Sequence, residues 1–207
     1  MQRPTSIPNT KRCCADVRSG NEKMAESAKD NRTAGDATDS WPDRIYSLLR
    51  EWKVAQVSYV PDGGHASLIR LVHADPSIRA ISLTTEEEGI AVCGGAWLGG
   101  QRSVMLMQSS GVGNCINMLS LLNACRFPFL TLVTMRGEWG EFNPWQVPMG
   151  GRVQASFEMM NAHCLRADVA EDVHDVVQAA GRMAFEGGVS VAVLLSQRLI
   201  GAKVFVK

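Results

Sequence analysis

Short apolar runs recur along the chain, and between them lie longer stretches in which apolar residues return every three or four positions. The runs predict β-strands, because a strand that is covered on both faces is apolar at nearly every position. The spaced stretches predict amphipathic helices. The expected strands are 56–60, 79–83, 103–108, 129–134, a short one near 164–165, and 189–195; the expected helices are 41–52, 65–74, a glycine-rich one within 84–100, 114–125, 154–162 and 171–185.

Strands and helices alternate in this prediction, which is typical of an α/β domain with a parallel sheet. The run Val191–Leu195 has no polar residue at all, as expected for a strand between two layers of helices. The predicted fold is therefore a three-layer α/β domain built on a parallel sheet.

The domain is expected to begin near Ser40, a favourable N-cap residue before Trp41 and Pro42. Residues 1 to about 40 contain only Ile7 and Val17 as branched aliphatics, so they cannot bury enough apolar surface to offset the entropy of ordering. We predict a disordered tail over 1–40 and one folded domain over 41–207.

Composition narrows the possible partners. Among 207 residues, 21 basic and 21 acidic residues balance, so no net charge directs the chain to nucleic acid or to a membrane surface. The N-terminus lacks the apolar core of a signal peptide, which favours a cytoplasmic location. Six cysteines without a C-x-x-C pair indicate buried thiols rather than a zinc site or a disulfide framework.

Candidate chemistry lies where strands end, because ligands of open α/β sheets gather beyond the carboxyl ends of the strands. Four such turns are unusual in composition: 61–65 (Pro-Asp-Gly-Gly-His), 86–88 (Glu-Glu-Glu), 108–114 (Gln-Ser-Ser-Gly-Val-Gly-Asn) and 136–141 (Arg-Gly-Glu-Trp-Gly-Glu).

The three glutamates at 86–88 open the glycine-rich helix. Thr84 and Thr85 each precede a glutamate by three residues, so helix capping alone explains the acids. Chemistry is the other interpretation, because each interior glycine costs about 1 kcal/mol against alanine and is accepted mainly where a backbone or a flat ligand comes close. This stretch by itself leaves both open.

The other turns also leave two interpretations each. Gly111 and Gly113 fit a turn that presents free amides to an anion, and they fit a purely structural turn; they match neither a dinucleotide fingerprint nor a P-loop. His65 is either a solvated helix residue or an acid-base group beside Asp62. Arg136 is either a surface residue or a clamp for a carboxylate, phosphonate or sulfonate.

The segments 59–65, 86–91, 107–117 and 135–138 together resemble the pyrimidine-binding domain of thiamine-diphosphate decarboxylases. Within that superfamily the chain is most similar to the sulfopyruvate and phosphonopyruvate decarboxylases, above all to the alpha subunit of the two-chain sulfopyruvate enzyme. The resemblance covers roughly residues 41–205.

The resemblance implies a role for each of these residues. A glutamate at this helix start bonds N1′ of the cofactor aminopyrimidine, and spacing back from Ala96-Trp97 identifies it as the catalytic Glu87. The cofactor contacts are then Glu87, Ser110, Gly111, Gly113 and Asn114, and the substrate contacts are Asp62, His65 and Arg136.

The superfamily holds the cofactor diphosphate and Mg²⁺ with a Gly-Asp-Gly motif on a separate domain. The nearest match here, Gly35-Asp36-Ala37, lies in the predicted tail, so we expect no metal ligands in this chain. The resemblance then implies a hetero-oligomer with a diphosphate-binding beta subunit that supplies the Mg²⁺ site.

The implied activity is that of a lyase subunit, which decarboxylates sulfopyruvate or phosphonopyruvate to CO₂ and an aldehyde. The alternatives are a carboligase subunit of the acetolactate-synthase type and a non-catalytic pyrimidine-domain binding module.

Overall fold

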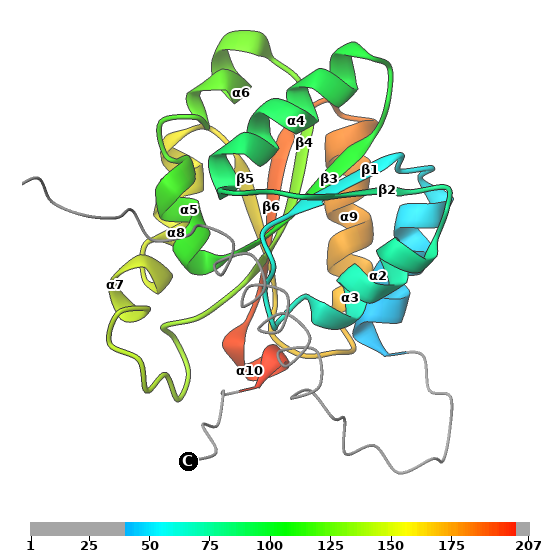
Figure 1. Ribbon diagram of the computed structural model, residues 1–207. Helices are drawn as coiled ribbons and strands as arrows, with labels where there is room; N and C mark the ends of the chain where they lie inside the picture. The colour runs from blue at the N-terminus through cyan, green and yellow to red at the C-terminus, as the bar shows by residue number, and fades with distance from the viewer. Residues whose placement is uncertain (1–39, 202–207) are drawn as a thin grey trace, which may run out of the picture. The chain divides into compact units, whose positions relative to one another are not determined.

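The computed structural model describes residues 40–201, so the predicted tail over 1–39 lies outside the described residues (Figure 1). Within this range six strands form one sheet in which every neighbouring pair is parallel, in the order β2-β1-β3-β4-β6-β5. This topology confirms the predicted parallel α/β fold. The strands are β1 (Gln56–Tyr59), β2 (Arg79–Ser82), β3 (Ser103–Gln108), β4 (Phe129–Thr134), β5 (His163–Ala167) and β6 (Ser190–Leu195).

Helices cover both faces of the sheet (Figure 1). The helices are α2 (Trp41–Glu51), α3 (Ala66–Ala74), α4 (Glu86–Leu98), α5 (Ser109–Cys115), α6 (Ser120–Cys125), α7 (Val147–Gly150), α8 (Val153–Met159), α9 (Val173–Phe185) and α10 (Gln197–Ile200). One core packs α2, α3 and α9 against the sheet, and the other packs α4, α5, α6 and α8 against its opposite face.

The interior strand β6 shows how the sequence builds these two cores. Val191, Val193 and Leu195 enter the core with α2 and α9, whereas Ala192 and Leu194 enter the core with α4 and α8. Because successive side chains of a strand point to opposite faces, a strand between two cores must be apolar at every position.

Helix α2 begins at the predicted residue, with Ser40 as its N-cap. Asp43 accepts a hydrogen bond from the Ser40 backbone N–H at 3.1 Å and completes a capping box with the Ser40 hydroxyl. Farther along the face shared by α2 and α9, the Trp52 indole packs on Gly181, where a Cβ atom would have no room. Helix α2 is thereby fixed to the sheet through α9.

The predicted boundaries around 109–125 were wrong. Ser109 already begins α5, so Gly111 and Gly113 lie inside a helix rather than in a turn, and the predicted helix 114–125 is broken between Cys115 and Ser120. Glycine favours turns, but a helix also accepts it where a neighbour packs against the backbone. Glu86 and Met149 are those neighbours.

The other differences concern short elements. The predicted loop 135–151 contains α7, and α10 follows β6 without having been predicted. Both are single turns of four residues, too short to give a periodic signal in the sequence.

Cysteines in the described part of the chain are free thiols. Burial raises the pKa of Cys93 to about 11, and burial, with a smaller effect from the Glu86 and Glu87 carboxylates, raises the pKa of Cys115 to about 12. These two side chains behave as small apolar core residues. In residues 40–201 we also find no helix long and apolar enough to cross a membrane.

Candidate functional site

Three of the four turns selected from the sequence meet at the carboxyl ends of neighbouring strands. Asp62 follows β1, Gln108 ends β3, and Thr134 and Arg136 lie at the end of β4. They line a hollow of only about 20 Å³, too small to enclose a whole substrate molecule. Within this chain the polar side chains therefore bond mainly to one another.

Asp62 is the centre of this polar cluster. Its carboxylate accepts hydrogen bonds from Gln108 Nε2 at 2.7 Å, from Thr134 Oγ1 at 2.5 Å and from the backbone N–H of Gly64 at 3.2 Å. Burial on its own would raise the pKa of Asp62, but the His65 ring and these three donors together hold it below its ordinary value. Asp62 is therefore an anionic group with fixed geometry.

Ser110 joins this cluster through Gln108. Its hydroxyl donates to Gln108 Oε1 at 3.0 Å, and since the other end of that amide donates to Asp62, the side-chain amide is held in one orientation. The structure thus brings two predicted site residues, Ser110 and Asp62, into one network.

His65 lies beneath this network and is only 1% exposed. Its Nε2 atom lies 3.0 Å from the carbonyl oxygen of Leu132, so Nε2 carries the proton and Nδ1 is the acceptor. Nδ1 has no hydrogen-bond partner among the described residues. Burial lowers the pKa of His65, and the nearby Asp62 carboxylate and backbone carbonyl groups oppose this shift.

Arg136 is paired within the chain. Its Nε and Nη2 atoms each donate to the Glu141 carboxylate at 2.6 Å, and the two side chains are 8% and 3% exposed. Hydrogen bonds from Arg136, which outweigh the effect of burial, lower the pKa of Glu141 to about 2. The guanidinium that was predicted to bind an anionic ligand is therefore already paired with the Glu141 carboxylate, which lies in the same loop.

Gln197 is a buried residue of this region that the sequence analysis missed. Its Oε1 accepts the backbone N–H groups of Glu138 and Trp139, each at 3.0 Å, and its Nε2 donates to Glu141 at 2.9 Å. Gln197 follows β6, so the strand-end rule that selected the other turns also applies to it. It fixes the 137–141 loop over the ends of β4 and β6.

The three glutamates that begin α4 have different environments. Glu86 is 9% exposed and accepts a hydrogen bond from Asn114 Nδ2 at 2.8 Å. Gly111 packs directly on its carboxylate, leaving no room for a Cβ atom there. Glu88 accepts the backbone N–H of Thr84 at 3.0 Å, which is a capping contact. Two of the acids are thus occupied within the chain.

Glu87 is the remaining acid. Its side chain is exposed, and within residues 40–201 we find no hydrogen bond or ion pair that engages it. By helix periodicity it shares a face of α4 with Ala91, Gly94 and Gly95. The carboxylate is therefore available to a group outside this chain.

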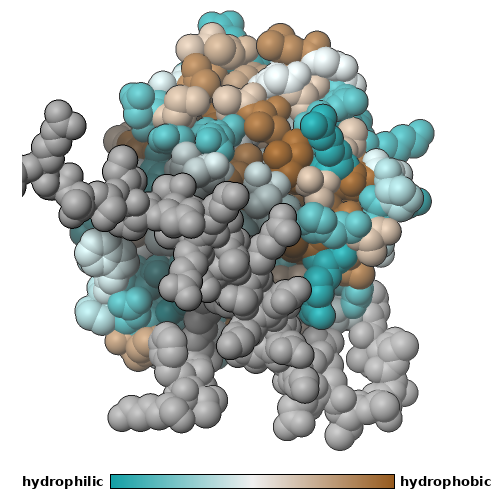
Figure 2. All heavy atoms as spheres, in the orientation of Figure 1, coloured by the Kyte–Doolittle hydropathy of each residue, from teal (hydrophilic) through white to brown (hydrophobic). Residues whose placement is uncertain are grey.

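The same face of α4 is apolar and hollow. A depression of about 400 Å³ is lined by residues of α4, including Gly94, Gly95 and Leu98, and by Leu121 and Phe127. Trp97 and Leu98 are 50% and 87% exposed, and Figure 2 shows apolar side chains gathered where α4 lies in Figure 1. We call this surface, Glu87 together with the depression, the open face of α4.

Gly113 and Asn114 lie on the other side of Glu86. A Cβ atom on Gly113 would come within 3.1 Å of Met149 Sδ, so this glycine allows α5 to pack near α7. Asn114 is engaged by Glu86. For a metal the described part of the chain offers no group of three or more His, Cys, Asp or Glu side chains.

Comparison with known proteins shows the family of this chain. The chain is 30% identical over 151 residues to sulfopyruvate decarboxylase subunit alpha of Methanocaldococcus jannaschii, covering 72% of this chain and 89% of that protein. It is also 30% identical over 154 residues to the subunit alpha of Methanococcus maripaludis, with 74% and 92% covered.

The chain belongs to the sulfopyruvate decarboxylase alpha-subunit family. No protein-family model matches it. A phosphonopyruvate decarboxylase of Streptomyces viridochromogenes shares 41% identity over 101 residues, which are 48% of this chain and 25% of that protein. The matches thus span most of the two alpha subunits but only a quarter of the phosphonopyruvate enzyme.

Solved structures support the fold of this family member. The 2-oxoglutarate:ferredoxin oxidoreductase of Magnetococcus marinus matches with a TM-score of 0.60 at 13% identity, over 90% of this chain and 35% of that chain. A candidate thiamin diphosphate-dependent enzyme of Mycobacterium smegmatis matches with a TM-score of 0.60 at 18% identity, over 76% and 30%. These matches confirm the predicted α/β fold, and the relatives confirm the predicted resemblance to sulfopyruvate and phosphonopyruvate decarboxylases.

Proposed function

We propose that this chain is a subunit of a thiamine-diphosphate-dependent decarboxylase that acts on sulfopyruvate or phosphonopyruvate and releases CO₂ and an aldehyde. The observation that carries the proposal is the unengaged carboxylate of Glu87 at the edge of an apolar, glycine-lined face, next to two glutamates that the chain itself occupies. The names of the relatives supply the reaction and the two substrates.

The open face of α4 suits the pyrimidine half of the cofactor. A flat ring needs close approach and an apolar surface, and Gly95 has nothing within 4 Å of where a Cβ atom would lie. Glu87 would hold the proton at N1′ of the aminopyrimidine, a task for a carboxyl group in a cleft that excludes water. When bound, thiamine diphosphate would supply a nucleophilic carbon for the 2-keto group and would accept the electron pair that stays behind when CO₂ leaves.

The remaining predicted cofactor residues would support the position of Glu87 through contacts with its neighbours. Asn114 and Gly111 fix Glu86, and this packing sets the position of the first turn of α4 on which Glu87 lies. Ser110 orients Gln108 at the edge of the same region. These residues would position the carboxylate, and Gly113 allows their helix to pack closely.

We infer that a second chain holds the diphosphate and its Mg²⁺. Mg²⁺ prefers six oxygen ligands in near-octahedral order, and no cluster of acidic side chains in residues 40–201 provides them. The name "subunit alpha" of the relatives agrees with a partner. We propose that a diphosphate-binding beta subunit covers the open face of α4 and encloses the cofactor against Glu87.

The acidic end of the substrate would meet the polar cluster at the strand ends. Arg136 carries five N–H groups, of which Glu141 takes two, so the pair still attracts a tetrahedral oxyanion, although less strongly than a free guanidinium. Asp62, held by Gln108 and Thr134 and supported by His65, would orient the polar groups on the same side.

Assembly and activity test the proposal together. The chain is co-expressed with a diphosphate-binding partner, and decarboxylation of sulfopyruvate, phosphonopyruvate and pyruvate is measured with Mg²⁺ and cofactor. We expect activity on one of the two anionic substrates from the complex, and none from this chain alone. Acetolactate formation from pyruvate would identify a carboligase, and assembly without turnover would identify a binding module.

Arg136→Lys tests the substrate contact within the active complex. The ammonium keeps the charge but loses the bidentate geometry, so the Michaelis constant for the anionic substrate should rise more than that for pyruvate. Equal changes for both substrates would give Arg136 a purely structural role.

A further inference from the structure

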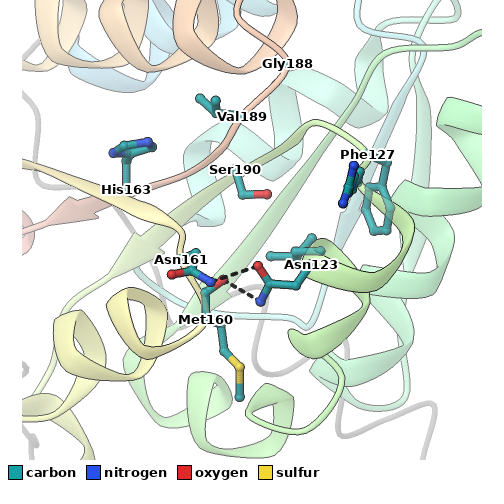
Figure 3. A pocket seen from close by; sticks show the side chains of 10 residues that line it. Asn123, Phe127, Met160, Asn161, His163, Gly188, Val189 and Ser190 are labelled. Atoms are coloured by element: carbon teal, nitrogen blue, oxygen red, sulfur yellow. Dashed lines mark hydrogen bonds between the residues drawn. The ribbon is translucent and has the colours of Figure 1, made fainter.

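A second hollow lies at the opposite end of the sheet. It has a volume of about 440 Å³, and the first residues of two strands, His163 of β5 and Ser190 of β6, lie on its wall (Figure 3). Since all strands are parallel, their amino ends share one edge of the sheet, away from Asp62 and Arg136. The hollow is separate from the proposed active site, and its size suits a small organic molecule.

The wall of this hollow combines apolar and basic groups. Leu122, Phe127 and Val189 supply apolar surface, while Arg126 supplies a permanent positive charge. None of the described residues that line it has a carboxylate. Such a wall favours a ligand with one negatively charged end and an apolar body.

Two asparagines fix the shape of the hollow. Asn161 Nδ2 donates to Asn123 Oδ1 at 3.1 Å, and Asn123 Nδ2 donates to the carbonyl oxygen of Met160 at 3.0 Å. In Figure 3 these linked side chains lie between His163 and Phe127. They tie the end of α6 to the turn after α8, so a ligand meets a wall that is already formed.

The backbone of Arg126 is unusual. Arg126 follows α6 with φ 53° and ψ 45°, a left-handed conformation that glycine or asparagine adopts more easily. Among the described residues only Lys53, Arg126 and Asn161 have positive φ without being glycine, and two of the three line this hollow. Arginine adopts this backbone conformation less easily than glycine, but it places a guanidinium on the wall of the hollow.

We propose that this hollow binds a small organic anion, a phosphate ester or carboxylate with an apolar body. The charged end pairs with Arg126 through charge-assisted hydrogen bonds, and the body packs on Phe127 and Val189. The site is distinct from the cofactor cleft, so its presence does not depend on the decarboxylase activity.

Phenyl phosphate and inorganic phosphate are the probes, added to the full ¹⁵N-labelled chain. We expect phenyl phosphate to shift the amide resonances of 122–127, 160–163 and 188–190 in a saturable way, and to bind more tightly than inorganic phosphate. The absence of saturable shifts at millimolar phenyl phosphate, or shifts confined to 108–114 and 136–141, would overturn the proposal.

Arg126→Gly tests the charge without straining the backbone. It should weaken phenyl phosphate binding by about tenfold, as for the loss of a charge-assisted hydrogen bond, while the melting temperature stays the same or rises. Lys53→Gly is the matched control, because Lys53 is an exposed cation with φ 54° that does not line the hollow. Arg126→Lys should lie between wild type and Arg126→Gly. Equal affinity in Arg126→Gly and wild type, or an equal loss in Lys53→Gly, would contradict the site.

Discussion

Glu141 and Glu87 both follow the carboxyl ends of strands, yet one side chain is buried and paired whereas the other is exposed and unpaired among residues 40–201. Glu141 is 3% exposed at its side chain and is held by Arg136, Gln197 and backbone N–H groups. Glu87 is exposed and is engaged by none of the residues in 40–201. The Glu141 carboxylate has its hydrogen-bond partners within the chain, and the Glu87 carboxylate is accessible to a group from outside.

The contrast between Glu141 and Glu87 distinguishes a structural acid from a candidate catalytic acid at this edge of the sheet. A buried charge that lacks partners costs several kcal/mol, so a buried acid must be satisfied within the chain. An exposed acid carries no such cost and is free to serve a ligand. The self-contained network therefore forms the rigid support, and the open face of α4 is where we place the chemistry.

Glu87→Gln should give the largest effect. Turnover of the assembled enzyme should fall by about 10²–10⁴, the range for a positioned acid-base group, while the fold is kept. Steady-state kinetics and circular dichroism measure both. Glu88→Gln is the control and should retain near-normal turnover, because Gln also accepts the Thr84 N–H. Normal turnover in Glu87→Gln with loss in Glu86→Gln would move the catalytic role to Glu86.

Arg136→Ala should strongly destabilise the closed network. It leaves the Glu141 carboxylate buried without its cation, so the free energy of unfolding should fall by about 3–5 kcal/mol. Urea denaturation of the purified chain measures the change. Arg136→Ala combined with Glu141→Gln should recover part of the loss, and additive losses would show that the two side chains are not coupled.

Gly111→Ala and Gly95→Ala compare the buried and the open sides of α4. The new methyl at 111 would overlap the Glu86 carboxylate, so the free energy of unfolding should fall by about 1–3 kcal/mol. At 95 nothing lies within 4 Å, and alanine should stabilise the isolated chain by up to about 1 kcal/mol. Similar losses at both positions would contradict the open face.

Acid should weaken the Arg136–Glu141 pair gradually. The pKa of Glu141 is about 2 in the folded chain against an ordinary 4.5, so its contribution is complete above about pH 4.5 and is lost as the pH falls toward 2. Urea denaturation across this range should show a smaller difference between wild type and Glu141→Gln at low pH. A constant difference would show that Glu141 does not titrate with the network.

Much of the fold could be predicted from the sequence. Val191–Leu195 is apolar throughout and lies between two helical layers, as the pattern predicted. Helix α5 was misjudged because Gly111 favours a turn locally, and only contact with Glu86 shows why a helix contains it. The four-residue helices α7 and α10 were too short to leave a period in the sequence.

For the site, the sequence by itself determined which residue types gather at the strand ends, because strand order along the chain fixes where each turn emerges. Residue type alone could not distinguish the roles of Glu86, Glu87 and Glu88, and only the family resemblance selected Glu87. Tertiary packing decided that Glu86 meets Asn114, that Arg136 meets Glu141 and that Glu87 faces outward. The physical reason is that pairing and burial depend on contacts between residues far apart in the chain.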